Sequence, residues 1–176
     1  MFTLKKFNPH TLWILPLGIV LALIAWKFIP KRNRFSAEQS QAMQLVLGDL
    51  KDARITIYQI DGQGGEHPPP KPGVIYFHEY PILTEKKFEP KDFNWLKETL
   101  TAPTTYDTTN FGCFDPGLGL TIDKDGKKTD LVICLRCQGM FVYKLDENIP
   151  FKHLSREGCK ILMAIYKDYF KSETTK

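Results

Sequence analysis

The sequence predicts an α+β fold: an N-terminal transmembrane helix followed by an antiparallel sheet of four or five strands, with helices packed on one face. Three observations favour this fold. A long apolar run comes first, alternating β-branched and aromatic residues dominate the centre, and helical periodicity occurs before, within and after that centre without the βαβ alternation of a parallel sheet. With 176 residues, 43% of them hydrophobic, the chain has the size of one domain plus an extra segment.

The apolar run, TLWILPLGIVLALIAWKFIP, occupies residues 11–30. About 20 residues rising about 1.5 Å each cover the hydrocarbon core of a bilayer, and Trp13 and Trp26 suit its two interfaces. A buried soluble helix is the weaker alternative because it would show a polar stripe, and a cleaved signal peptide would have a shorter apolar run. We therefore expect residues 1–35 to be a membrane anchor with basic flanks, and residues 36–172 to be a soluble α+β domain.

The positive charge of the chain is concentrated in the anchor. Six of the 24 basic residues lie in the first 35 positions, which contain no acid, so 18 basic residues stand against 20 acidic ones in the remainder. A slightly acidic domain has no basic face for phosphates, and we expect no nucleic-acid partner. The basic residues on the two sides of the apolar run differ by about one charge, which weakly favours a cytoplasmic domain.

The first elements of the expected domain follow from periodicity and turn residues. Ser36 and Gln39 form a capping box for a helix from Ser36 to about Asp52. RITIYQI alternates as a strand, and glycine and proline make DGQGGEHPPPKPG a loop. Strand character resumes in VIYFHEYPILTEKKF, and EPKDFNWLKETL predicts a short second helix with Pro90 near its start.

The clearest β region is LGLTIDKDGKKTDLVICLRCQGMFVYKL. Asp125-Gly126 predicts one hairpin turn and Gln138-Gly139 a second, which gives three antiparallel strands. A last helix follows Ser155, which suits an N-cap, and its apolar stripe comprises Leu162, Ile165, Tyr166 and Tyr169.

The chain has four cysteines: Cys113, Cys134, Cys137 and Cys159. An all-cysteine zinc site normally has two close pairs, and only Cys134 and Cys137 form a C-x-x-C. If their strand continues to Cys137, the two side chains point to opposite faces and both act as small hydrophobes. A disulfide between Cys113 and one of the pair, or a metal site, are the alternatives. A thioredoxin-like redox pair is disfavoured, because such a pair stands at a helix N-terminus and this C-x-x-C follows a predicted strand. Cys159 lies close to the apolar stripe of the last helix and is predicted to be a core residue.

Other candidate residues offer little chemistry. His67 lies in the glycine- and proline-rich loop, where a lone histidine is usually inert. His78 and Glu79 are neighbours in a predicted strand, so their side chains would face opposite ways and could not act on one substrate atom. CFDPGLGL has the residues of a tight turn, and no P-loop motif follows it. Because no nucleophile, base and oxyanion site are assembled, we expect neither an enzyme nor a cofactor.

The order FHEYPIL, CFDPGLGL and TDLVICLRC before MFVY is similar to a family of bacterial membrane-anchored or lipoprotein-type domains of unknown function. The family pattern is a Phe-His/Gly-Tyr-Pro-type strand, then Cys-Phe/Tyr-x-Pro and Ile-Cys-Phe-x-Cys. The resemblance covers roughly Arg54 to Phe170 and departs at Gly117-Leu118, where the family tends to have Arg-His. The matching positions are Phe77, Tyr80, Pro81, Cys113, Phe114, Pro116, Ile133, Cys134 and Cys137.

This resemblance implies an exported domain, so we expect a single-pass protein of the bacterial inner membrane with its soluble domain on the extracytoplasmic side. The expected function is that of a non-enzymatic interaction or envelope-associated module, with the bilayer bound through residues 11–30 and a protein partner possible. The alternative is a thiol-dependent redox or metal-binding activity centred on Cys113, Cys134 and Cys137.

Overall fold

The computed structural model describes residues 31–48, 50, 52–62, 69–108, 114–144, 147–149 and 151–170. The chain divides into two units, residues 1–34 and 35–176, and the fold described below is that of the second unit. The predicted transmembrane segment, residues 11–30, lies outside the described residues and stays a prediction. Among the helices that are described, none is both long and apolar enough to cross a membrane.

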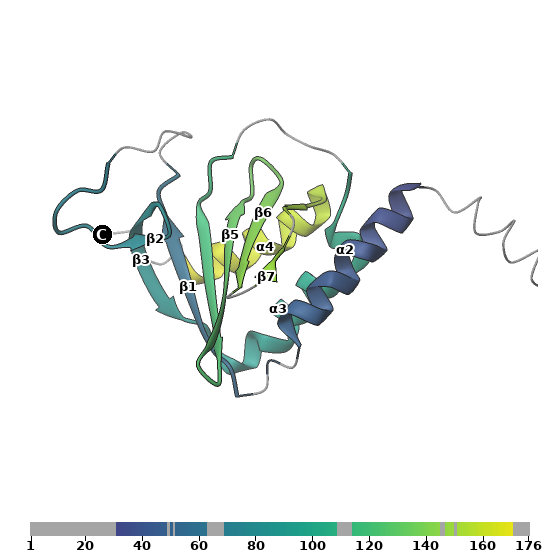
Figure 1. The fold of residues 1–176 in the computed structure, drawn as a ribbon, viewed down its shortest axis with the longest axis horizontal. Coiled ribbons are helices and arrows are strands. Elements are labelled where there is room, and N and C mark those ends of the chain that lie inside the picture. The colour runs from purple at the N-terminus through teal and green to yellow at the C-terminus, as the bar shows by residue number, and fades with distance from the viewer. Residues whose placement is uncertain are drawn as a thin grey trace, which may run out of the picture. The chain divides into compact units, whose positions relative to one another are not determined.

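An antiparallel sheet forms the framework of the domain (Figure 1). Its strands follow the order β2-β3-β1-β4-β5-β6-β7, and β8 pairs with β6 as well. The prediction of four or five strands is too low because β2, β7 and β8 have two residues each, too few to show an alternating pattern. The bounds are β1 Arg54–Ile60, β2 Tyr76–Phe77, β3 Tyr80–Lys87, β4 Leu118–Lys124, β5 Lys127–Cys134, β6 Gly139–Lys144, β7 Glu147–Asn148 and β8 Lys152–His153.

Helices cover one face of this sheet, and the main core lies between them and the strands. The helical elements are α2 Lys31–Leu47, η3 Pro90–Asp92, α3 Phe93–Thr101, η4 Pro103–Thr105 and α4 Arg156–Phe170. Fully buried residues of the strands meet fully buried residues of α2, α3 and α4 in a single cluster, which includes Ile57, Leu120, Leu131, Met140, Met43, Leu96 and Leu162. The predicted α+β class with helices on one face is confirmed.

The first described helix differs from its prediction. Ser36 is not an N-cap, because α2 already includes the five residues before it. Its buried hydroxyl donates to the backbone oxygen of Tyr106 at 2.8 Å, and Ser40, one turn further on, donates to the backbone oxygen of Thr101. The helix ends at Leu47 rather than near Asp52, because Gly48 takes the left-handed conformation, with φ 55°, that commonly terminates helices. These two serines therefore bind α2 to the last residue of α3 and to the segment that follows it.

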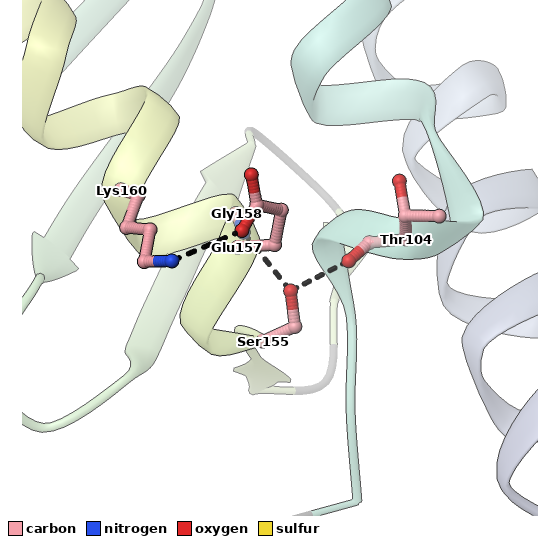
Figure 2. Close-up of polar contacts among 5 residues, drawn as sticks. All are labelled: Thr104, Ser155, Glu157, Gly158 and Lys160. Carbon is pink, nitrogen blue, oxygen red and sulfur yellow. Dashed lines mark hydrogen bonds and ion pairs between the residues drawn. The ribbon is translucent and has the colours of Figure 1, made fainter.

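Several local predictions are confirmed. β1 has the predicted residues, and Asp125 and Gly126 form the predicted hairpin turn with φ values of 53° and 77°. Ser155 caps α4, as Figure 2 shows: its Oγ accepts the Gly158 N–H at 2.9 Å and donates to the Thr104 backbone oxygen at 2.5 Å. The cap thus joins the start of α4 to η4 as well as satisfying the helix end.

The sheet face opposite the helices, here called the outer face, carries two aligned rows of side chains. The pairing register puts Thr56, Thr121, Asp130 and Tyr143 in one row across β1, β4, β5 and β6. The next row contains Tyr58, Gly119, Val132 and Phe141. A second, smaller apolar cluster on this face includes Ile60, Phe77, Tyr80 and Val132.

Candidate functional site

A tight hairpin brings His78 over the outer face. The predicted continuous strand through YFHEYP is wrong: Phe77 pairs with Tyr80 across the β2–β3 hairpin, and His78-Glu79 is the two-residue turn between them. His78 has φ 54°, a conformation that is uncommon for residues with a side chain and persists only where the surroundings hold it. His78 and Glu79 are therefore not successive strand residues that face opposite ways, as the sequence predicted.

Phe77 fixes this hairpin to the sheet. Its ring stacks on Tyr58 with a centroid separation of 4.6 Å and an interplanar angle of 25°. The same ring lies over Gly119, where an added Cβ atom would come within 2.6 Å of the Phe77 Cδ1 atom. Glycine at this row position thus provides the space into which the hairpin packs.

His78 pairs with Asp130 at the centre of the outer face. The imidazole Nε2 lies 3.1 Å from Asp130 Oδ2, and the Thr121 hydroxyl donates to Asp130 Oδ1 at 2.7 Å. Burial by itself would raise the pKa of Asp130, but the hydrogen bonds from His78 and Thr121, with the charges of His78 and Lys128, lower it overall. The carboxylate is thereby held ionised with both oxygens occupied.

Aromatic rings continue from His78 along the outer face. The His78 ring stacks on Tyr143 at 4.1 Å between centroids, and Tyr143 in turn lies 6.2 Å from Phe141. Phe141 contacts Phe114 and Phe151 edge-on, each at 4.7 Å. We call this connected set the aromatic row; its members are Tyr58, Phe77, His78, Phe114, Phe141, Tyr143, Phe151 and His153.

Two rings of the aromatic row are open to solvent. Phe141 is 36% exposed and Tyr143 is 39% exposed, and both lie on β6, between β5 and the two-residue β7. Tyr80, by contrast, is buried beneath the hairpin, and burial together with the neighbouring Glu79 carboxylate raises its pKa above the usual range of a tyrosine. Tyr80 therefore stays protonated and structural, while Phe141 and Tyr143 form the accessible part of the row.

The cysteine motif adopts a geometry that the sequence did not predict. β5 ends at Cys134, which pairs with Gly139 of β6, so Leu135–Gln138 is a four-residue turn rather than the predicted continuation of a strand. The predicted Gln138-Gly139 turn is likewise wrong. Cys134 and Cys137 are both buried, and the Cys137 N–H donates to Cys134 Sγ at 2.9 Å. Cys134 and Cys137 therefore do not lie on opposite faces of one strand, as predicted, because only Cys134 belongs to a strand.

Of the two remaining cysteines, Cys159 lies in the core and Cys113 is not among the described residues. Burial, with a smaller contribution from Cys134, raises the pKa of Cys159 to about 12, so this thiol is neutral and packs in the core as predicted. Cys113 lies outside the described residues. Two residues later, Asp115 forms an ion pair with Arg136 at 3.5 Å, which places the CFDPG segment from Phe114 onwards beside the cysteine turn.

Within the described ranges, no disulfide joins the cysteines, and no group of three or more His, Cys, Asp or Glu side chains is arranged to hold a metal ion. Whether Cys113 completes a cluster with Cys134 and Cys137 stays a prediction.

Sequence reasoning missed the roles of Asp130, Phe141 and Tyr143. A signal was present in GMFVYK, where aliphatic Met140 and Val142 alternate with aromatic Phe141 and Tyr143. A strand with one solvated face would alternate apolar with polar residues, so apolar side chains on both faces, aliphatic on one and aromatic on the other, indicate a second packed or binding surface. The turn at His78, whose ring packs on Tyr143, is distant from this strand in sequence, so the local pattern could not predict the contact.

Comparisons of this chain with protein-family models, with curated proteins and with solved structures found no match. The resemblance to a bacterial membrane-anchored family therefore stays a prediction.

Proposed function

We propose that this chain is a non-enzymatic interaction module that binds a protein partner through its outer face. In this proposal residues 11–30 tether it to the bacterial inner membrane and the domain stands on the extracytoplasmic side. The observation that carries the proposal is the connected aromatic row, which includes two neighbouring rings on β6, Phe141 and Tyr143, that are each more than a third exposed.

The composition of this surface suits a protein partner. Aromatic side chains dominate the energetics of protein interfaces, and rings already held by neighbouring rings lose little rotamer entropy on binding. The His78–Asp130 pair supplies polar groups beside the exposed rings, as in interfaces where a polar rim surrounds an apolar core. Nucleic acid is disfavoured because acidic residues outnumber basic ones after position 35.

The hydrogen bonds among His78, Asp130 and Thr121 support binding rather than catalysis. A nucleophile is activated when its hydroxyl donates to a base, which a third group orients. Here Asp130 stands between the other two groups, and the Thr121 hydroxyl donates to the carboxylate instead of to the imidazole. The arrangement fixes the His78 turn on the sheet and activates no hydroxyl.

The proposal is tested with the full chain in membranes extracted with mild detergent. A double variant, Phe141→Ala with Tyr143→Ala, should lose a higher-mass complex on native gels that the unaltered chain forms. Trp95→Ala is the matched control, because Trp95 on α3 is 39% exposed, the same as Tyr143. A complex that survives the double variant, or that Trp95→Ala disrupts equally, would contradict the proposal.

A second candidate function is favoured by one contact. The Cys137 N–H aimed at Cys134 Sγ is a donor placed where a thiolate carries its charge, which suits a thiol-dependent redox or metal-binding activity centred on Cys113, Cys134 and Cys137. Thiol titration of the folded full chain tests it: thiols at Cys134 and Cys137 that neither react nor bind metal would exclude this activity.

A further inference from the structure

We propose that Cys134 and Cys137 form a two-thiolate site for a soft monovalent metal ion of the Cu(I) type. This inference rests on the second candidate function and specifies its ligand.

The turn between β5 and β6 brings the two cysteines into one local structure. Cys134 is the last residue of β5, Cys137 follows three residues later within the turn, and Cys134 pairs with Gly139 at the start of β6. The 2.9 Å hydrogen bond from the Cys137 N–H to Cys134 Sγ draws the backbone of the second cysteine up to the sulfur of the first. Sulfur accepts such a bond more strongly as a thiolate, which is the form that binds metals.

The ligand set selects the class of ion. Zinc sites take four ligands, and calcium or magnesium take six or more oxygens. The described part of the chain offers no group of even three suitable side chains. Thiolate sulfur is a soft ligand that favours Cu(I), an ion that two sulfurs can satisfy.

Burial and charge also suit such an ion. Cys134 is 0% exposed and Cys137 is 3% exposed, so water competes little for the metal. Two thiolates and one monovalent cation leave a net charge of about −1. Arg136, which lies between the two cysteines in the same turn, puts a guanidinium near this charge, although its ion pair with Asp115 balances part of it and its side chain is 79% exposed.

Binding is a proton-for-metal exchange. Each thiol loses its proton as its sulfur bonds to the ion, so one Cu(I) displaces two protons and no electron is transferred. Affinity should therefore fall as pH is lowered. Burial opposes a free thiolate at Cys134 and Cys137 as it does at Cys159, so the bonding metal ion itself must drive the loss of the two protons. Cys159 is not assigned as a ligand, because no group of three or more His, Cys, Asp or Glu side chains in the described residues is arranged to hold a metal ion.

The test uses the reduced, detergent-purified full chain, titrated with Cu(I) without oxygen against a coloured Cu(I) chelator. We expect one ion per chain, with affinity lowered by about 100-fold or more in Cys134→Ser and in Cys137→Ser. Cys159→Ser is the matched buried control and should change affinity less than about twofold. Equal losses in all three variants, or no copper taken from the chelator, would overturn the site.

X-ray absorption of the copper-loaded unaltered chain identifies the atoms bound to copper, and this measurement does not depend on how the variants fold. Two sulfur neighbours with no nitrogen or oxygen neighbour are expected, and a third sulfur or any lighter ligand would overturn the two-thiolate assignment. Thiols that react with a disulfide reagent while the chain takes up no copper would overturn the metal site and leave a redox activity standing. The aromatic outer face is tested separately by its own variants.

Discussion

The ring of Phe77 occupies the space that a side chain at Gly119 would need, because a Cβ atom there would lie 2.6 Å from Cδ1 of that ring. Gly119→Ala should therefore force the β2–β3 hairpin away from the sheet and lower the free energy of unfolding by about 1–3 kcal/mol, as overpacking does. Urea denaturation measures this. At Gly117 an added Cβ meets nothing within 4 Å, so Gly117→Ala should stay within about 0.5 kcal/mol of the unaltered chain. Equal effects at the two glycines would count against the packing of Phe77.

The Asp130 carboxylate should make stability depend on pH. Its pKa in the folded chain lies below the ordinary value of 3.8, so its contribution is present above that pH and is lost as pH falls through the lowered value. Asp130→Asn should cost about 1.5–3 kcal/mol at pH 7, and the difference from the unaltered chain should shrink towards pH 2.

Asp123→Asn is the control for the pH series. Asp123 pairs with Arg54, whose side chain is 82% exposed, and an exposed ion pair contributes about 0–1 kcal/mol. Its Oδ1 also accepts the Gly126 N–H at 3.2 Å, a bond that the amide oxygen of asparagine can keep. Thermal or urea unfolding between pH 2 and pH 7 gives both curves. A difference at Asp130 that does not vary with pH would mean that its ionisation is not coupled to folding.

The cap of α4 should be worth a measurable part of the stability. Ser155→Ala leaves the Gly158 N–H and the Thr104 oxygen without the hydroxyl that bonds both, and should cost about 1–2 kcal/mol (Figure 2). Lys160→Ala removes only an ion pair with Glu157 on the surface of the same turn, and should change the free energy of unfolding by less than about 0.5 kcal/mol. Equal costs for the two variants would argue against the cap.

Cys159 should resist alkylation while the chain is folded. With a pKa of about 12 it carries almost no thiolate at pH 8, and its sulfur is shielded by the core. Iodoacetamide labelling followed by peptide mass spectrometry should modify Cys159 in urea and leave it intact in the native chain. Labelling at similar rates in both states would show that the start of α4 opens readily.

Local signals predicted the elements whose causes are local. The alternation of RITIYQI, the Asp125-Gly126 turn and the Ser155 cap depend on residues within a few positions of one another, and all three are found in the structure. Ser36 shows the limit of this reasoning, because a serine followed by glutamine three residues on resembles a cap. Its hydroxyl instead serves a tertiary contact with Tyr106, 70 residues away.

Gly139 led to a wrong prediction at the start of β6. Gly139 suggested a turn, yet it begins the strand, and Gln138 takes the positive φ of 55°. The reason is space: a Cβ atom at Gly139 would lie 2.2 Å from Cζ of Phe151. Gly119 and Gly139 both accommodate rings of the aromatic row, and such ring-to-glycine contacts across the sheet are not encoded in the neighbouring sequence. The candidate site was missed for the same reason, since His78 and Asp130 meet across 52 positions.

The proposed binding of a protein partner at the outer face is tested best by photo-crosslinking in living cells. A photoreactive phenylalanine analogue placed at position 141 in the full chain should give a defined crosslinked species, which Tyr143→Ala should weaken. The same analogue at position 95, on an exposed part of α3, serves as the control. We expect a strong crosslink at position 141 and a weak one at position 95; equal crosslinks at the two positions, or none at 141, would contradict binding through the outer face.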